Sequence, residues 1–408
     1  MTMRVRANLT IILALAIMGL ASCDHYNCAS GPNLGTSCTS SGPVTPIGDG
    51  TATSTASAFA FVVDEAGTID GYTLSSTADT FAATSGYTAP TVPTKDPGYG
   101  MVVAQKQFLY TAFIGTGQIF GWTIGSSGGL TPISGSPFSA PYLIGIGGNN
   151  GNQDMIVNPA GTLLFVDNDS AQGIFVYSIG STGALTQVSG SPFPVGFFPG
   201  NLATDGLGKY LYATTQLNGS EIAAFAIGST GALIPVPGSP FAYPMLQVQG
   251  DPTGNYLIGI EGGFTGDTHL YLFGITQSGS NAGAITQLEA VTTAYAPFDI
   301  AVQPNSGGNL VYSFSNAATG FNPIEGYQLS SGTLVAVTGS PFSGLADGNW
   351  AQFDQSGAFL FPYSALNSST GESITLGVLD VGSGGVLTQP IPPATLATPG
   401  AWTVTDVP

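Results

Sequence analysis

The sequence predicts an all-β protein, a seven-bladed β-propeller of four-stranded antiparallel blades. Three observations predict it: the composition, a repeat of about 50 residues, and two incomplete chain ends that complement each other. Hydrophobic residues make up 43% of the 408 residues, and charged residues only 7%. Gly, Ser, Thr, Pro and Asn fill the difference, which is typical of many short strands joined by tight turns.

The N-terminus predicts export. Arg4 and Arg6 precede an apolar run over 9–20, which ends in the letters LASC at Cys23. A basic start, about a dozen apolar residues and a small-residue end are typical of a secretory signal rather than a membrane-spanning helix. The LASC ending resembles the bacterial lipobox, which implies that residues 1–22 are removed and that Cys23 carries a lipid anchor. The alternative is an ordinary signal cleaved nearby, with Cys23 a plain thiol.

Residues 23–56 are rich in Gly, Ser, Thr and Pro and lack apolar periodicity, so we expect a flexible tether. Cys28 and Cys38 lie in it. In an oxidising envelope these two cysteines are expected to form a disulfide, the alternative being metal binding by two thiols. The expected location is therefore the bacterial cell envelope, outside the cytoplasm and anchored to a membrane by lipid.

The repeated segments define the propeller domain, which we expect to span 57–408. Four similar segments end in Gly-Ser-Pro-Phe at Phe138, Phe193, Phe241 and Phe342, with spacings of 55, 48 and 101 residues, the last being two periods. A period near 50 with four strands per copy is typical of propellers. We interpret the motif as structural, because proline is tolerated on an outer edge strand and phenylalanine can wedge between blades.

Each repeat offers an inner strand, a tight turn and three further strands. Turns such as Asn-Pro-Ala-Gly at 158–161 and Asp-Pro-Thr-Gly at 251–254 have type I turn chemistry. Six inner strands are expected near Val102, Met155, Leu202, Leu246, Ile300 and Ala351. The chain enters at 59–63 without an inner strand and ends with a strand over 401–405. We expect the C-terminal strand to complete the first blade, closing the ring and removing open sheet edges.

The segments 158–166 (NPAGTLLFV) and 176–193 (VYSIGSTGALTQVSGSPF) resemble those of the seven-bladed, 6-phosphogluconolactonase-like propellers. The resemblance covers roughly 57–408. It implies the propeller fold and a lactonase activity, but the matching residues are turns and strands.

Candidate functional residues lie on one face of the predicted ring. The turns between the first and second and the third and fourth strands share a stereotyped face, here called the turn face. The remaining loops share the opposite, irregular face, and function usually lies on variable loops. The candidate ligand-binding residues are Asp154, Asp167, Asn168, Asp169, Asn201, Glu261, His269 and Trp350.

Charge limits the possible ligands. Removal of the signal leaves three lysines and no arginine against 23 acids, which excludes nucleic-acid binding and argues against a phosphorylated lactone. Ca²⁺ bound by Asp167, Asp169 or Glu261 is chemically reasonable, because hard cations take oxygen ligands; the alternative is that these carboxylates are simply solvated. A lone histidine such as His269 is more often structural than catalytic.

Three functions remain open. The leading hypothesis is a monomeric, lipid-anchored module that binds a carbohydrate, peptide or protein on its irregular face. The alternative is a hydrolase of an unphosphorylated lactone, assisted by carboxylates or Ca²⁺. A purely architectural surface protein is the third possibility.

Overall fold

A computed structural model describes residues 57–408, except for 64–66, 77–78, 93–97, 114–116, 141–154, 169–171, 216–220, 262–265, 305–308, 316–322, 347, 365–373 and 397–400. The predicted signal, the tether and its three cysteines Cys23, Cys28 and Cys38 lie outside the described residues, as do Asp154 and Asp169. In the described ranges no helix is long and apolar enough to cross a membrane.

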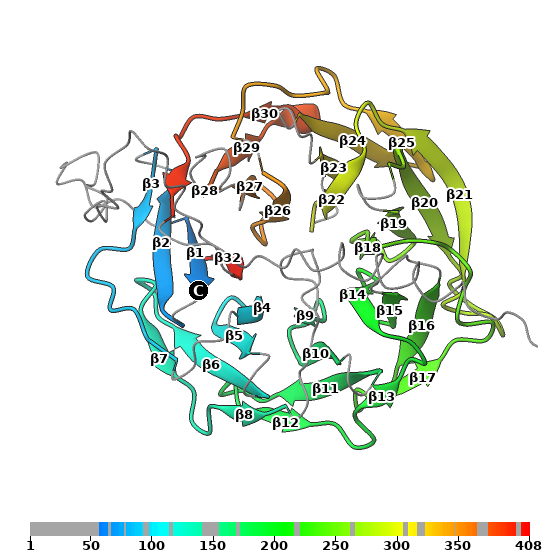
Figure 1. The fold of residues 1–408 in the computed structure, drawn as a ribbon, viewed down its shortest axis with the longest axis horizontal. Coiled ribbons are helices and arrows are strands. Elements are labelled where there is room, and N and C mark those ends of the chain that lie inside the picture. Colours follow the sequence, from blue (N-terminus) through cyan, green and yellow to red (C-terminus); the bar gives the residue numbers. More distant parts are fainter. Residues whose placement is uncertain are drawn as a thin grey trace, which may run out of the picture. The chain divides into compact units, whose positions relative to one another are not determined.

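The described residues form seven antiparallel sheets arranged around a central axis (Figure 1). Blade 1 contains β1 (Ala58–Val63), β2 (Ile69–Ser75), β3 (Thr80–Ala83) and β32 (Trp402–Asp406). Blade 2 contains β4 (Gly98–Ala104), β5 (Phe108–Phe113), β6 (Gln118–Ile124), β7 (Leu130–Pro132) and β8 (Phe138–Ser139). Blade 3 contains β9 (Met155–Val157), β10 (Leu163–Asn168), β11 (Gly173–Ile179), β12 (Leu185–Gln187) and β13 (Phe193–Pro194).

Blade 4 contains β14 (Pro199–Thr204), β15 (Tyr210–Thr215), β16 (Ile222–Ile227) and β17 (Leu233–Pro235). Blade 5 contains β18 (Gln247–Gly250), β19 (Tyr256–Ile260), β20 (His269–Ile275) and β21 (Ile285–Thr292). Blade 6 contains β22 (Pro297–Val302), β23 (Leu310–Ser315), β24 (Ile324–Ser330) and β25 (Thr333–Ala336). Blade 7 contains β26 (Trp350–Phe353), β27 (Phe359–Ser364), β28 (Thr375–Leu376), β29 (Leu379–Val381), β30 (Leu387–Thr388) and β31 (Ala394–Thr395).

The ring closes as the sequence predicts. The C-terminal strand β32 pairs antiparallel with β1, with Ala60 opposite Val404 and Phe61 opposite Thr403. Trp402, at the start of β32, is 1% exposed and packs into the cluster shared by blades 1 and 7. The prediction of a first blade completed by the last strand is confirmed.

The hydrophobic core is divided into seven clusters, one between each pair of neighbouring blades. Recurring hydrogen bonds reinforce three of these interfaces. The hydroxyls of Tyr110, Tyr212 and Tyr312 donate to the carbonyls of Gly183, Gly283 and Gly385 in the following blade, at 2.6, 3.0 and 2.7 Å. Each of these glycines lies in a turn with positive φ, where a Cβ would collide with a neighbouring side chain.

The Gly-Ser-Pro-Phe motif completes an interrupted outer strand. In blade 2, β7 pairs with one end of β6 and β8 with the other. Between them the backbone N–H of Gly121 donates to the Ser136 hydroxyl at 3.0 Å. The motif serines 191, 239 and 340 accept equivalent bonds at 2.9, 2.8 and 3.0 Å. The motif therefore has a structural role: its serine satisfies a strand N–H that would otherwise lack a partner.

The acids of the turn face are likewise structural. Asp205 Oδ1 accepts from the backbone N–H groups of Lys209 and Tyr210 at 2.6 and 2.7 Å. Asp251 makes the same kind of contact with the Tyr256 N–H at 2.7 Å. These bonds close the turn between the first two strands of blades 4 and 5, as the turn chemistry predicts.

Candidate functional site

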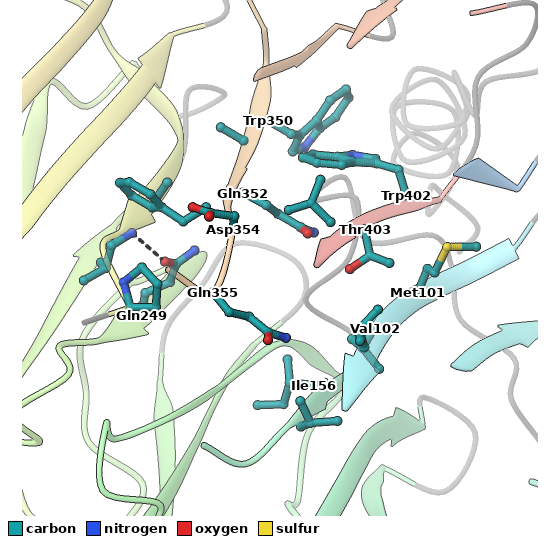
Figure 2. A pocket seen from close by; sticks show the side chains of 18 of the residues that line it. Met101, Val102, Ile156, Gln249, Trp350, Gln352, Asp354, Gln355, Trp402 and Thr403 are labelled. Carbon is teal, nitrogen blue, oxygen red and sulfur yellow. Dashed lines mark hydrogen bonds between the residues drawn. The ribbon is translucent and has the colours of Figure 1, made fainter. Parts of the chain in front are cut away.

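A cavity of about 280 Å³ lies among the inner strands β4, β9, β18, β22, β26 and β32 (Figure 2). The inner strands run from the irregular face toward the turn face. The cavity therefore follows the axis of the ring, where the period-50 repeat places the first strand of each blade.

The cavity lining combines apolar, aromatic and neutral polar side chains. Val102 and Ile156 contribute apolar wall, while Gln249, Gln352 and Thr403 contribute two amides and a hydroxyl (Figure 2). Among the residues that the structure describes, the lining includes two carboxylates, Asp299 and Asp354, and no Lys, Arg or His. Its polar groups can therefore donate and accept hydrogen bonds, but none offers a positive charge.

Three aromatic residues, Trp350, Tyr363 and Trp402, form what we call the aromatic wall. The Trp402 and Tyr363 rings stack with centroids 5.3 Å apart, and the Trp350 ring lies 6.1 Å from Tyr363. Phe298 of blade 6 meets Trp350 edge-on at 5.5 Å. Trp402 is buried, whereas Trp350 is partly exposed in the cavity, so Trp350 presents the wall to a ligand.

Polar side chains at one repeat position join neighbouring inner strands. Asn201, Gln247 and Asp299 each stand four residues before the turn of their blade, and all three are buried. Asn201 Oδ1 accepts from the Val248 N–H at 2.8 Å. Gln247 Nε2 donates to Asp299 Oδ1 at 2.6 Å, and the Ala351 N–H donates to Asp299 Oδ2 at 2.8 Å. A chain of hydrogen bonds thus crosses blades 4 to 7.

Burial dominates the titration of Asp299. Desolvation raises its pKa to about 7, against the opposing effect of the Ala351, Gln247 and Ile300 donors. We call the hydrogen bonds made by Asn201, Gln247 and Asp299 the polar seam. A carboxyl group that lines a cavity and has a pKa near neutrality makes this seam a candidate functional position.

A second polar cluster lies on the irregular face of blade 5, at the loop between β19 and β20. We call Glu261, Asp267, His269 and Tyr271 the blade 5 cluster. His269 Nδ1 lies 2.8 Å from Asp267 Oδ1, and the Tyr271 hydroxyl donates to Glu261 Oε1 at 2.9 Å. The His269 and Tyr271 ring centroids are 5.9 Å apart. Two predicted site residues, Glu261 and His269, are therefore brought together through Tyr271.

The other predicted residues are placed separately. Asp167 and Asn168 end β10 at the irregular face of blade 3 and are 0% and 1% exposed. Among the described candidates, Trp350 is the one that lines the cavity. Within the described ranges no group of three or more His, Cys, Asp or Glu side chains is placed to hold a metal ion.

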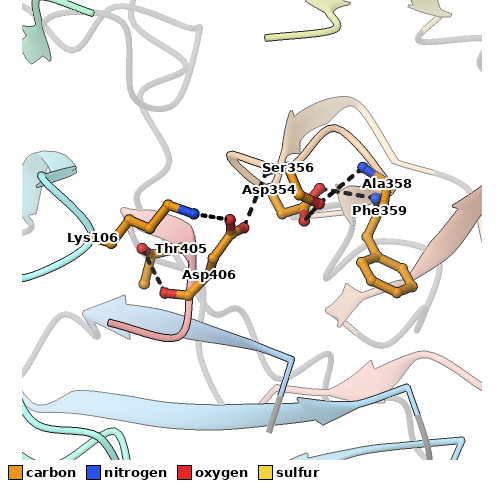
Figure 3. A network of polar contacts seen from close by, with 7 residues as sticks. All are labelled: Lys106, Asp354, Ser356, Ala358, Phe359, Thr405 and Asp406. Atoms are coloured by element: carbon orange, nitrogen blue, oxygen red, sulfur yellow. Dashed lines mark hydrogen bonds and ion pairs between the residues drawn. The ribbon is translucent and has the colours of Figure 1, made fainter. Parts of the chain in front are cut away.

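The turn-face end of the cavity carries a polar network across three blades (Figure 3). Lys106 of blade 2 forms an ion pair with Asp406 of blade 1, whose Oδ1 accepts from the Ser356 N–H at 3.3 Å. The Ser356 hydroxyl donates to Asp354 in blade 7. Burial, and then the nearby Asp406 carboxylate, raise the pKa of Asp354 to about 6.

Sequence reasoning missed most of the cavity lining, including Gln249, Asp299, Gln352 and Trp402. The signal that could have found the seam is the register of the repeat. Counting four residues back from the equivalent positions 205, 251, 303, 354 and 406 returns Asn201, Gln247, Asp299, Trp350 and Trp402. The sequence favours the irregular loops instead, because function so often lies on variable loops.

No family model matches the sequence. Over 110 residues the chain is 31% identical to the 6-phosphogluconolactonase of Xenorhabdus nematophila, which covers 27% of this chain and 30% of that protein. The chain thus matches about 30% of the length of this curated relative.

Solved structures match far more of the chain. A Bacteroides uniformis protein provisionally described as a 6-phosphogluconolactonase has a TM-score of 0.61 at 14% identity, covering 86% of this chain and 99% of that chain. A Lactobacillus plantarum protein also has a TM-score of 0.61, at 15% identity, with 86% and 99% covered. The periplasmic gluconolactonase of Pseudomonas aeruginosa has a TM-score of 0.55 at 16% identity, with 86% and 100% covered.

The protein has the fold of the lactonase-type propellers. The resemblance drawn from its repeats is confirmed at that level. A shared fold does not show a shared activity, so the activity has to be argued from the site.

Proposed function

We propose that the propeller is a binding module whose channel cavity holds a small, uncharged, polyhydroxylated ligand such as a sugar or a sugar lactone. The observation that carries the proposal is the lining itself. Trp350 offers an apolar aromatic surface, and Gln352 and Thr403 offer donors and acceptors around it. The Gln249 amide is already bonded to β22, through the Ile300 carbonyl at 2.7 Å and the Val302 N–H at 3.0 Å. The cavity volume of about 280 Å³ lies near the lower limit for ligand pockets, which favours a small ligand.

The charge of the lining sets the expected selectivity. A phosphorylated sugar would bring a dianion next to Asp299 and Asp354, and none of the described lining residues carries a positive charge to neutralise it. We therefore expect the unphosphorylated form of a sugar to bind more tightly than its phosphate ester.

Calorimetric titration of the full chain with D-glucose, D-gluconolactone and glucose 6-phosphate tests the proposal. Saturable binding of an unphosphorylated ligand, weakened at least tenfold by Trp350→Ala, would support it. Tyr295→Ala is the matched control, because Tyr295 is an aromatic residue that is 41% exposed and absent from the cavity lining. No binding of these probes, or equal loss in both variants, would contradict it.

We further propose that this module is held at the cell envelope by a lipid on Cys23 and works as a monomer outside the cytoplasm. Two facts support the location: the lipobox-like LASC ending, and the periplasmic description of the Pseudomonas aeruginosa neighbour. Palmitate labelling in a bacterial host should tag the wild-type chain and not Cys23→Ser. Equal labelling of both chains would exclude the anchor.

Lactone hydrolysis is the second candidate, favoured by the blade 5 cluster and by the lactonase relatives. The Asp267 carboxylate holds His269 Nδ1, which leaves Nε2 to act as a general base; the His269 side chain is 36% exposed. His269 would take a proton from water as the water oxygen attacks the lactone carbonyl. The ring C–O bond would then break, and the leaving oxygen would take that proton to give the hydroxy acid.

A pH-stat assay on a panel of unphosphorylated lactones separates the two functions. Turnover that is lost in His269→Gln and reduced in Asp267→Asn would establish hydrolysis, and a parallel assay with a chelator tests the Ca²⁺ hypothesis. If turnover is equal to the uncatalysed rate for every lactone, the hydrolase proposal fails, whereas the binding proposal is unaffected.

A further inference from the structure

We infer that Asp299 is a positioning residue that holds Trp350 at the cavity and makes ligand binding depend on the protonation of this seam. The inference rests on the proposed binding function for its ligand, but its central measurement needs no ligand. It concerns the contact between β22 of blade 6 and β26 of blade 7.

Two successive residues of β22 fix two successive residues of β26. The Phe298 ring meets the Trp350 ring edge-on, with an interplanar angle of 68°. The Asp299 carboxylate accepts from the N–H of Ala351, the residue that follows Trp350. Blade 6 therefore holds both the ring of Trp350 and the backbone next to it. We call these two contacts the clamp.

The second carboxylate oxygen of Asp299 extends the clamp to blade 5. Gln247 Nε2 donates to it at 2.6 Å and lies 3.5 Å from the Ile300 carbonyl. Gln247 Oε1 is buried and has no hydrogen-bond partner among the described residues. Turning the Gln247 amide would bring Oε1 to the position next to Asp299, where a protonated carboxyl group could donate to it. This pair can therefore satisfy either protonation state of Asp299.

The two states hold Ala351 with different strength. A hydrogen bond to a carboxylate is about twice as strong as one to a neutral acceptor, so protonation loosens the clamp on β26. Burial raises the pKa of Asp299 to about 7, and the groups that oppose this rise are the Gln247 amide and the Ala351 and Ile300 N–H groups. No charged side chain of the described chain contributes to this shift. The other carboxylate of the cavity lining is Asp354.

Acrylamide quenching of tryptophan fluorescence in the full chain tests the clamp directly. Trp122 and Trp402 are 4% and 1% exposed, so quenching reports mainly on the partly exposed Trp350. We expect the quenching constant to rise on acidification with a midpoint near pH 7, and to lose this transition in Asp299→Asn. Asp354→Asn is the matched control and should retain it.

Gln247→Met gives an independent readout that does not depend on how Asp299→Asn folds. It removes a donor to the carboxylate, so the midpoint should move to higher pH. A flat wild-type profile between pH 5 and 9, an unchanged midpoint in Gln247→Met, or a wild-type profile in Asp299→Asn would each overturn the inference.

Ligand titration then tests the link to binding. D-glucose, used as the probe, should bind roughly fivefold more weakly at pH 5.5 than at pH 8 in the wild type, and equally at both in Asp299→Asn. If the quenching transition is present and glucose does not bind at either pH, the proposed function fails while the clamp stands. If glucose binds with no pH dependence, the clamp has no role in binding.

Discussion

Replacing Tyr212 by phenylalanine should destabilise the propeller by about 1 to 2 kcal/mol, the cost of one buried, unmade hydrogen bond. The Tyr212 hydroxyl donates across the interface of blades 4 and 5 to the Gly283 carbonyl at 3.0 Å, and Tyr212 is fully buried. The substitution removes the donor and leaves the carbonyl oxygen behind in a site that excludes water.

The repeat supplies the evidence that the phenylalanine ring itself will fit. Tyr212 pairs with Ala203, and at the equivalent register Phe165 pairs with Ile156 in blade 3 and Phe361 with Gln352 in blade 7. Both phenylalanines are 0% exposed. The loss should therefore come from the hydroxyl group alone and not from strain or a cavity.

Urea unfolding followed by far-UV circular dichroism measures the loss as a lower midpoint at constant slope. Tyr110→Phe and Tyr312→Phe should each cost a similar amount, and the three losses should add because the sites lie at separate interfaces. Tyr243→Phe is the control, because among the described residues the Tyr243 hydroxyl accepts a single long bond, 3.4 Å from the Gln287 N–H. A loss for Tyr212→Phe no larger than that of the control would refute the reasoning.

Three further predictions concern stability. Gly183→Ala should cost at least about 2 kcal/mol, seen as a lower melting temperature, because its φ is +81° and the new Cβ would lie 2.6 Å from Phe108. The unfolding free energy of the wild type should fall as pH rises from about 4 to 7, since the folded-state pKa values of Asp354 and Asp299, about 6 and about 7, lie above their unfolded values. Asp354→Asn should flatten that fall, by up to about 3 kcal/mol at pH 8; an unchanged slope would contradict this origin. Lys106→Met should cost less than about 1 kcal/mol, because Lys106 is 44% exposed in its ion pair with Asp406, and the cost should vanish in 1 M salt.

The blade count and the closure of the ring could be predicted because both depend on local sequence patterns. Strand periodicity, turn residues and the Gly-Ser-Pro-Phe motif recur at a fixed spacing, and each acts within its own blade through contacts such as Ser136 with Gly121. A missing inner strand at one end of the chain and a spare one at the other then determine how the ring closes. The lactonase-type fold followed from the same repeats.

The site could be predicted only in part, because it is made where blades meet. Trp350 was singled out from sequence, and the structure places it in the cavity. Asp299 could not be recognised in the same way, since nothing near it in sequence distinguishes its carboxyl group from other strand positions.

The Asp299 carboxylate accepts one hydrogen bond from Gln247 and one from Ala351. Each of these partners lies about 50 residues from Asp299 along the chain. Its raised pKa comes from burial between three blades, a property of the assembled ring. The sequence by itself thus determined the repeat, the number of blades and the scarcity of basic side chains, which argues against a phosphorylated ligand. The tertiary structure alone decided which side chains share the channel, because radial packing brings together residues that are one or more whole repeats apart.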